Sequence, residues 1–406
     1  MVAEKHRDKK INPNTVRNIL TLRYDPLQKP LLPKLNWTNF IENKEKPSLE
    51  ILEKLIEKTI KIQTKNAKNI AIALSGGVDS TLVLTFLRKI LPKIQIDAIS
   101  VKFANSVDET KSAERIARYF NVNHHIVKLD NYLKELPKAI SITRLPFWDL
   151  HWYYVVKKAQ TLSKYLASGD GGDEIFGGYT FRYKKFLQLT KKDSTPLKKV
   201  KAYLDCHERD RVPDQHLLFG KKYDFTWKSI YDILIPYFNN KLPRLNQVFL
   251  ADYNGKLLHN FSLVNTLLHR FYKIEPIVPL LSKELISYVI PLSSQFKYDP
   301  TKNVGKLLLR KLLKKYNVES LITEEKLGFN VNTINLWKAY GHSMCKHYLT
   351  NSIVVNDGWI NQDWIDKYID KSELDVKYVN KFLGLLAFEI WYRIFITKEL
   401  KPNVLK

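Results

Sequence analysis

Two glycine-rich segments of the sequence bring hydroxyl groups, carboxylates and a freely turning backbone together. The first is ALSGGVDSTL, residues 73–82, whose two glycines allow a tight turn and bring backbone N–H groups close to a phosphate. Ser75 and Ser80 add hydroxyl donors, and a helix that begins here would direct its positive end at an anion. The pattern differs from the Walker A loop. The segment at 73–82 predicts a phosphate-binding loop, and the alternative is a serine- and glycine-rich turn that binds no ligand.

The second segment, ASGDGGDEIFGGY at residues 167–179, holds five glycines and three carboxylates in thirteen residues. Its carboxylates suit two kinds of chemistry. One is to hold Mg²⁺, a hard cation that prefers carboxylate and phosphate oxygens. The other is to act as general base towards an incoming amine. A solvated acidic turn would have the same composition, but the flanking glycines and the preceding strand pattern favour a ligand site.

Apolar runs and helical patterns alternate around these two segments. Short apolar runs predict strands at 69–74, 94–103, 124–129 and 164–168. Three- and four-residue apolar spacing predicts helices at 48–62, 80–91, 106–120 and 150–162. Ser48 is a candidate N-cap for the first of these helices. We therefore expect the α/β fold class, a doubly wound parallel sheet with helices on both faces, and a ligand beyond the carboxyl ends of its strands.

The chain divides into three predicted parts. Residues 1–47 contain several prolines and few periodic apolar patterns, so we expect an extended N-terminal arm. Residues 48–180 form the predicted α/β core. Strand signals fade after residue 180, and we expect residues 181–400 to be mainly helical.

The first glycine-rich segment resembles the PP-loop of the ATP pyrophosphatase superfamily. Members of that superfamily cleave ATP between the α and β phosphates, adenylate a carbonyl or carboxyl oxygen, and let a nucleophile displace AMP. By position, the resemblance implies a pyrophosphate cradle of Ser75, Gly76, Gly77, Asp79 and Ser80. It also implies that the backbones of Leu74 and Val101 meet the adenine and ribose of ATP.

The second segment resembles the synthetase-domain motif of asparagine synthetases and of the β-lactam and carbapenam synthetases. In that family the acid at the position of Asp170, usually a glutamate, deprotonates the attacking amine. The resemblance implies that Mg²⁺ and pyrophosphate are held by Asp79 and Asp173. It also implies that the ATP site is lined by Ser168 and Gly169.

Two lysine-containing segments follow in the order that the family shows. NVGKLLLRKLL, with Lys306 and Arg310, resembles the start of a family helix, and EEKLGFN, with Lys326, resembles a later lysine-glycine-phenylalanine segment. In the family these lysines contact ATP phosphates and the transition state, where cationic groups stabilise developing charge. The resemblance therefore implies catalytic roles for Lys306 and Lys326 as well as Asp170. It covers roughly residues 50–340 and is diffuse between 185 and 245.

The implied activity is that of an ATP-dependent, AMP-forming carbon–nitrogen ligase. A small-molecule carboxylate, by default L-aspartate, is adenylated with release of pyrophosphate, and ammonia or another amine then displaces AMP. Complete asparagine synthetases carry a catalytic cysteine after the initiator methionine, whereas this chain has Val2 and only 74 residues before Ser75. We therefore expect no glutamine hydrolysis by the family route. The nitrogen would come from free ammonia, an amine on the substrate or a separate glutaminase partner.

The side of the site that accepts the carboxylate departs further from the family. In TLLHRFYKIEPIVPLLS, residues 266–282, Glu275 and Pro279 match the family pattern. The family's aspartate, arginine, glycine, arginine and final aspartate are replaced by Thr266, Leu267, Lys273, Ile277 and Ser282. Asp149, in PFWDLHWYY, matches a family segment near the substrate. These replacements predict altered packing or altered substrate recognition, including amide or peptide formation on a substrate other than aspartate.

The charge of the chain suggests a different class of protein. With 66 basic and 41 acidic residues, the formal net charge is +25, as nucleic-acid binding would require. The lysines are scattered, however, which favours a dispersed basic surface over a nucleic-acid partner. A PP-loop tRNA-modifying enzyme remains an alternative, although such enzymes lack the segment at 167–179. A non-catalytic nucleotide-binding relative is a third reading, disfavoured because both loops are present.

Cysteine usage and apolar runs bear on location. Cys206 and Cys345 are isolated and form neither a CxxC nor a zinc-binding pattern. The start, MVAEKHRDKKINP, lacks the apolar stretch of a signal peptide. No window approaches the ~18–20 apolar residues that span a bilayer. We therefore expect a cytoplasmic protein that does not enter a membrane.

Overall fold

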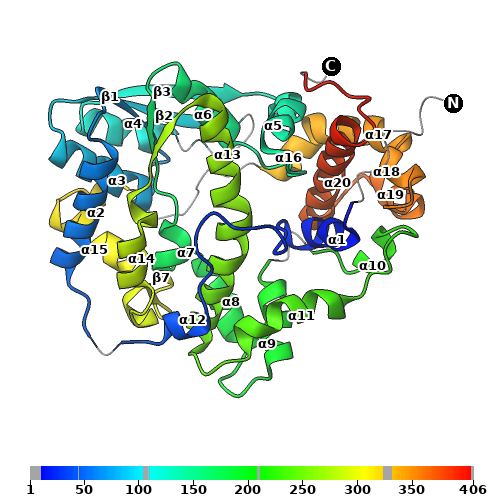
Figure 1. The fold of residues 1–406 in the computed structure, drawn as a ribbon, viewed down its shortest axis with the longest axis horizontal. Helices are drawn as coiled ribbons and strands as arrows, with labels where there is room; N and C mark the ends of the chain where they lie inside the picture. The colour runs from blue at the N-terminus through cyan, green and yellow to red at the C-terminus, as the bar shows by residue number, and fades with distance from the viewer. Residues whose placement is uncertain are drawn as a thin grey trace.

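The computed structural model describes residues 11–43, 45–103, 108, 110–207, 211–322 and 332–403. Within these residues the centre of the molecule is a five-stranded, all-parallel sheet with the order β3-β2-β1-β4-β5 (Figure 1). Its strands are β1 (Asn69–Ala73), β2 (Gln95–Phe103), β3 (Asn123–Leu129), β4 (Tyr165–Ala167) and β5 (Glu275–Ile277). The predicted fold class is confirmed.

The helices around the first four strands lie where the periodicity predicts them. They are α2 (Leu49–Gln63), α3 (Val78–Ile90), α4 (Thr110–Tyr119) and α6 (Trp152–Gln160). Ser48 caps α2, because its hydroxyl accepts a hydrogen bond from the Ile51 N–H at 3.3 Å. Since crossovers between parallel strands are right-handed, the path from β1 through β2 to β3 and back to β4 places α3 and α4 on one face and α6 on the other. With both faces covered, Ile70 and Ile72 of β1 are fully buried.

The edge strand β5 lies where strand signals in the sequence have faded, so the helical expectation for the region after residue 180 misses it. Glu275 pairs with Tyr165 and Ile277 pairs with Ala167. A strand of three residues is too short to show alternation, and its central residue, Pro276, argues against a strand because it cannot donate a hydrogen bond. The edge position tolerates this proline, since one side of the strand has no neighbour to receive an N–H.

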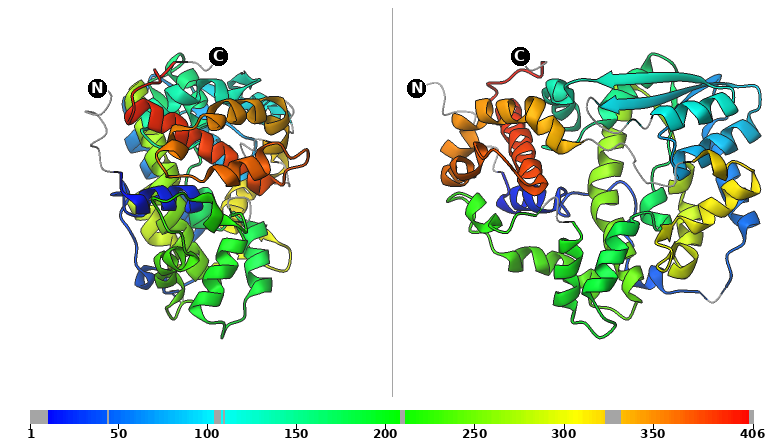
Figure 2. Two further views of the ribbon diagram at one scale, coloured as in Figure 1. Left: turned by 90° about the vertical axis from the view of Figure 1, so that its right-hand side faces the viewer. Right: turned by 180° about the vertical axis from the view of Figure 1, so that it is seen from behind.

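Most of the remaining helices gather around either α12 or α20, and Figures 1 and 2 show these two groups beside the sheet. The first group comprises α8 (Thr180–Leu189), α9 (Pro196–Asp205), α11 (Trp227–Phe238) and α12 (Arg244–Asp252). The second comprises α16 (Thr333–Leu336), α17 (His342–Thr350), α18 (Ile353–Asn356), α19 (Gln362–Ile369) and α20 (Val376–Phe395). Elsewhere lie α5 (Leu136–Thr143), α7 (Gly172–Phe176), α10 (Gln215–Leu218), α13 (Ser262–Tyr272), α14 (Lys283–Val289) and α15 (Leu307–Lys315). In the described part of the chain, none of these helices has both the length and the apolar character needed to span a bilayer.

The expectation of an extended N-terminal arm is wrong for Pro13–Leu22, which form the helix α1. The Asn12 side chain caps this helix by accepting from the Asn14 N–H at 2.9 Å, and Pro13 occupies a first-turn position where its missing N–H costs nothing. The proline that suggests an extended arm is therefore a helix-start signal. Val16 and Leu20 are buried, and α1 packs against α20.

A short antiparallel hairpin, β6 (Tyr298–Asp299) and β7 (Val304–Gly305), leads into α15. Lys306 follows it directly, at the N-cap position of α15. The Lys306 N–H donates to the Phe176 carbonyl of α7 at 3.1 Å. This bond holds the end of the hairpin against the loop that follows β4.

A buried lysine supports the start of the same hairpin. Lys297 is 1% exposed, and its ammonium donates to the Ile290 carbonyl at 2.9 Å and lies 5.3 Å from the centre of the Phe249 ring. Burial lowers the pKa of Lys297 to about 7, because the charged form loses its hydration. Its carbonyl accepts from the Leu307 N–H at 3.2 Å. Because folding lowers the pKa of Lys297, the stability of the fold is linked to the protonation of this side chain.

Replacing Lys297 with methionine should weaken the pH dependence of stability. In the wild type the unfolded chain binds more protons than the folded one between about pH 7 and the ordinary lysine pKa of 10.5, so the free energy of unfolding rises with pH in that window. Urea unfolding at pH 7 and about pH 9.5 should show this rise smaller by about 2–4 kcal/mol in Lys297→Met. Lys228→Met, at an exposed lysine, is the control. The same rise in Lys297→Met as in the wild type would contradict the linkage.

Candidate active site

A cavity of about 720 Å³ lies beyond the carboxyl ends of β1 and β4, where the order of the strands reverses. The loop after β1, the loop after β4, the start of α13 and the junction of β7 with α15 meet there. Most of the predicted site residues line it: Ser75, Gly77, Asp79, Ser80, Ser168, Gly169, Asp170, Asp173 and Lys306. The fold therefore brings the two glycine-rich segments to one place, as their positions after parallel strands predict.

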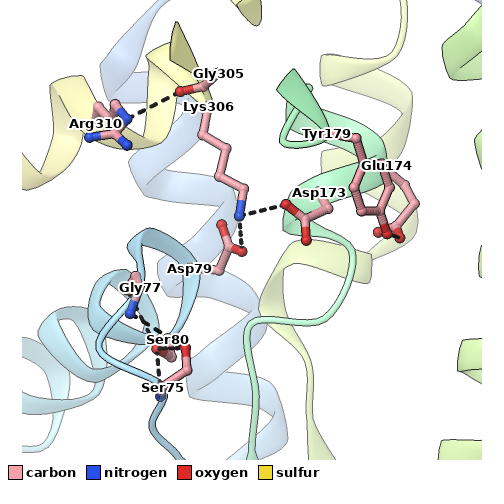
Figure 3. A network of polar contacts seen from close by, with 10 residues as sticks. All are labelled: Ser75, Gly77, Asp79, Ser80, Asp173, Glu174, Tyr179, Gly305, Lys306 and Arg310. Carbon is pink, nitrogen blue, oxygen red and sulfur yellow. Dashed lines mark hydrogen bonds and ion pairs between the residues drawn. The ribbon is translucent and has the colours of Figure 1, made fainter. Parts of the chain in front are cut away.

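The loop between β1 and α3 is a compact turn closed by its two hydroxyl groups (Figure 3). Ser75 Oγ and Ser80 Oγ lie 3.2 Å apart, and the Gly77 N–H donates to Ser75 Oγ at 3.4 Å. Gly77 is the N-cap residue of α3 and offers no side chain to the N–H groups of the first turn. Hydroxyl and N–H donors thus gather at the positive end of a helix, which suits a phosphate.

The loop after β4 packs so closely on the first loop that side chains at its glycines would collide. A Cβ at Gly169 would lie 2.5 Å from Asp79 Cβ, and one at Gly172 would lie 2.3 Å from Asp79 Cγ. A Cβ at Gly178 would lie 1.9 Å from Asp173 Oδ1. These glycines therefore make room for the two carboxylate side chains, and the predicted approach of the backbone to a phosphate stays a prediction.

Lys306 joins carboxylates from both loops (Figure 3). Its ammonium contacts Asp79 Oδ2 and lies 2.8 Å from Asp173 Oδ1, with 10% of the side chain exposed. Burial acts to lower the pKa of Lys306, but the charges of Asp173 and Asp79 outweigh it and hold this pKa above the ordinary lysine value. The φ of Lys306 is 56°, in the left-handed region that residues with a Cβ rarely adopt and that often marks functional sites.

The donor set of Asp79 and Asp173 fits Mg²⁺, which is commonly bound by one or two carboxylates together with substrate phosphates. Among the described residues, no group of three or more histidine, cysteine, aspartate or glutamate side chains could hold a metal ion. Phosphate oxygens would have to complete the coordination shell. The ammonium of Lys306 would then share the two carboxylates with the metal, and the Mg²⁺ site stays a prediction.

Asp170 lies beside α13. Its Oδ2 accepts a hydrogen bond from Asn265 Nδ2 at 2.7 Å. Burial raises the pKa of Asp170 above its ordinary value, while the hydrogen bond from Asn265 favours the charged form and acts in the opposite direction. A carboxylate with a raised pKa is a stronger proton acceptor, as a general base requires.

Glu174, the third carboxylate of the second segment, is 4% exposed and accepts a hydrogen bond from the Tyr179 hydroxyl. Burial raises the pKa of Glu174 to about 7, and the charge of Asp173 acts in the same direction. Near neutral pH, Glu174 therefore carries less negative charge than an ordinary glutamate. Asp79 and Asp173 are left as the counter-charges of Lys306.

Some predicted residues do not line the cavity. Leu74 is fully buried, with its N–H bonded to Ile99 O at 2.9 Å and its carbonyl accepting from Ser100 Oγ at 2.6 Å. Val101 is buried in β2, and Gly76 sits against Ser112 of α4. Contacts from Leu74 and Val101 to adenine and ribose therefore stay predictions, and β2 already uses the backbone of Leu74. Lys326 lies outside the described residues.

The structure adds residues to the cavity that the motifs do not indicate. Lys111 and Arg115 on α4 supply cations near the first loop. Asn260 and Asn265 supply amide groups, and Asn265 contacts Asp170. Helical periodicity of α4 could have placed Lys111 and Arg115 on one face, since they are four residues apart. The two asparagines carry no such signal, because nothing local relates them to a loop about a hundred residues earlier.

The divergent run at 266–282 is used largely for packing and for ending helices. Ile277, where the family pattern has arginine, is fully buried in β5. Lys273, where the pattern has glycine, ends α13 with a φ of 54°, the conformation that glycine adopts most easily. Ser282 accepts from the Leu285 N–H at 3.4 Å and caps α14. These three residues therefore have packing, helix-ending and capping roles in this fold, and altered substrate recognition stays a prediction.

Known proteins are similar to this chain over much of its length. The family model of asparagine synthase matches residues 51–393. The glutamine-hydrolyzing asparagine synthetase 1 of Bacillus subtilis is 22% identical over 405 residues, 90% of this chain and 62% of that protein. The glutamine-hydrolyzing asparagine synthetase of Mus musculus is 27% identical over 177 residues, 40% of this chain and 31% of that protein. The NH3-dependent NAD+ synthetase of Carboxydothermus hydrogenoformans is 33% identical over 167 residues, 35% of this chain and 64% of that protein.

The chain spans less than two thirds of the length of each of these relatives. Within the chain, the family match runs from α2 into α20 and contains the sheet, both glycine-rich loops and Lys306. Residues 11–43, with α1, lie outside it. The family resemblance of the two loops is confirmed by this match over most of the sequence, and the chain belongs to the asparagine synthase family.

Proposed function

We propose that this chain is an ATP-dependent ligase that forms an amide bond and releases AMP and pyrophosphate. The observation that carries the proposal is the contact of the Lys306 ammonium with Asp79 and Asp173 between the two glycine-rich loops. An ammonium group and two carboxylates lie there next to the donor-rich start of α3, a set of groups that suits cleavage of a polyphosphate. Membership of the asparagine synthase family supports the same chemistry.

On the ATP side, Ser75, Ser80 and the first-turn N–H groups of α3 bind the departing pyrophosphate. Lys306 stabilises the negative charge that grows on the phosphate oxygens as the bond between the α and β phosphates breaks. Mg²⁺ held by Asp79 and Asp173 would neutralise charge on the polyphosphate. Lys326 is a proposed second cation on this side.

On the acceptor side, a carboxylate oxygen of the substrate attacks the α-phosphorus and forms an acyl-adenylate. An amine then attacks the acyl carbon, Asp170 takes up the proton that the amine loses, and AMP leaves with the electron pair of the broken bond. L-aspartate with ammonia is the substrate pair to test first. Free ammonia or a separate glutaminase protein would supply the nitrogen.

Asp173→Asn should abolish most of the activity. The substitution preserves the size of the side chain and removes the charge that faces Lys306 and Mg²⁺, so kcat should fall about 100-fold or more. The measurement is release of AMP and pyrophosphate from ATP with Mg²⁺, L-aspartate and ammonium, separated by ion-exchange chromatography. The matched control is Asp232→Asn, which breaks an exposed ion pair with Lys228 on α11 and should leave the rate unchanged.

Two outcomes of this experiment would overturn the mechanism. ADP as the nucleotide product would show cleavage at the wrong phosphate bond. An unchanged rate in Asp173→Asn would show that the reaction does not need the charge interaction on which the proposal rests. ATP binding without AMP release across a panel of carboxylates and amines would instead favour the non-catalytic alternative.

The pH dependence of kcat should report the state of Asp170. Asn265→Ala removes the hydrogen bond that favours the charged carboxylate, so the pKa of Asp170 should rise further. The general base then becomes protonated at higher pH, and the acidic limb of the kcat profile should move up by about one pH unit. Asp170→Asn should lose this limb together with most of the activity. A limb that stays in place in Asn265→Ala would show that another group limits the rate at low pH.

A further inference from the structure

The N-terminal segment that lies outside the family match contacts two residues that line the cavity, Asp149 and Asn260. Arg23 follows the last residue of α1, and its backbone N–H bonds to Ile19 O at 3.0 Å. Its φ of 61° places it in the left-handed region, so the chain turns sharply at this residue. This turn directs both the side chain and the carbonyl of Arg23 towards the part of the fold that surrounds Asp149.

Arg23 contacts two separate elements that line the cavity. Its guanidinium forms an ion pair with Asp149 and lies 5.3 Å from the centre of the Trp148 ring. Its carbonyl accepts a hydrogen bond from Asn260 Nδ2 at 2.7 Å. Asp149 belongs to the loop before α6, and Asn260 belongs to the π-helical segment Tyr253–Phe261. Arg23 therefore ties together two walls that are far apart in the sequence.

Asp149 and Asn260 line the cavity, whereas Arg23 does not. These two residues line the large cavity together with Asp170 and Asn265. Asn260 and Asn265 lie on one continuous helical run, 253–272. Trp152 at the start of α6 bonds to His269 of the same run at 3.2 Å. Arg23 lines a neighbouring cavity of about 20 Å³, which it shares with Asp149. Any effect of Arg23 on a bound substrate thus acts through the residues that it holds.

The rest of the segment is anchored well enough to hold Arg23 in place. Asn254 of the π-helical segment bonds to both backbone groups of Leu35, at 3.0 and 2.8 Å. Tyr253 donates its hydroxyl to Pro33 O at 3.2 Å. π-Helical turns are rare and frequently occur at functional sites. The segment thus fixes the element that carries Asn260 at several points.

We propose that Arg23 is a positioning residue for the acceptor side of the cavity. Its guanidinium holds and neutralises the carboxylate of Asp149, and its carbonyl holds the amide of Asn260. Without the guanidinium, the charge of Asp149 would face an incoming carboxylate substrate and repel it. A segment outside the region shared with the family then helps to set which carboxylate binds. The inference rests on the proposed function for the identity of this side of the cavity.

Arg23→Asn tests the proposal. Asparagine tolerates the left-handed conformation and keeps the carbonyl for Asn260, so the variant removes the guanidinium selectively. In the AMP-release assay, KM for L-aspartate should rise about tenfold, while KM for ATP should change less than about twofold. Arg23→Lys should recover part of the loss because it restores the charge. Arg23→Asn with Asp149→Asn should also recover part of it, because the repelling charge is then gone.

The matched control is Arg211→Asn. Arg211 also pairs with an aspartate, Asp205, and lies 4.6 Å from the centre of a tryptophan ring, Trp227, but it does not line the cavity. The Arg211→Asn substitution should leave the KM values for L-aspartate and for ATP unchanged. Equal changes in the two KM values of Arg23→Asn, or no change in either, would overturn the proposal.

Hydrogen exchange separates this proposal from the proposed function. In the full chain without ligands, Arg23→Asn should speed amide exchange about threefold or more in residues 147–152 and 253–261, and leave residues 74–80 unchanged. Uniform exchange changes, or none, would overturn the positioning role. If the wild type releases no AMP with L-aspartate and ammonium, that result counts against the proposed substrate, and the exchange data still decide the role of Arg23.

Discussion

The ammonium group of Lys306 can remain charged in its buried position only because two carboxylates face it. Removing any one of these three side chains would leave an uncompensated charge with little access to water, which is far more costly than losing an exposed ion pair. The three groups come from the first turn of α3, from α7 and from the residue between β7 and α15. Electrostatic compensation therefore holds these segments in register, and the glycines beside Asp79 and Asp173 provide the space that it needs.

The environment shifts the pKa values of Lys306 and Asp170 in ways that suit different roles. The pKa of Lys306 is raised by its carboxylate partners, so this side chain stays a cation. The pKa of Asp170 is raised by burial, which favours proton uptake. Such separation of roles by environment is what a site needs when one part stabilises phosphate charge and another accepts a proton. Both groups line one cavity but are held by different partners, Lys306 by Asp79 and Asp173 and Asp170 by Asn265.

The ATP side and the acceptor side are built in different ways. On the proposed ATP side, each loop follows its own strand and most of the donors come from one short stretch of chain, although Lys306 reaches Asp79 and Asp173 from far along the chain. On the acceptor side, functional groups are held by partners far away in sequence: Asp170 by Asn265, and Asp149 by Arg23. Changes in the distant partner can therefore alter substrate recognition while the loops stay the same. This difference explains why the loops indicate the reaction class and leave the carboxylate substrate open.

The sequence by itself determined the parallel α/β core, the helices around β1 to β4 and the two loops, because strand and helix periodicities and glycine-rich turns are local properties. It did not reveal β5, whose three residues form a strand only by pairing with β4, or α1, because a proline near a helix start is also typical of an extended arm. Only the tertiary structure decided that Lys306 lies between Asp79 and Asp173, that Asn265 bonds to Asp170 and that Arg23 reaches Asp149. Each of these contacts joins residues about a hundred or more positions apart, and such contacts depend on how the whole chain packs, which no local pattern encodes.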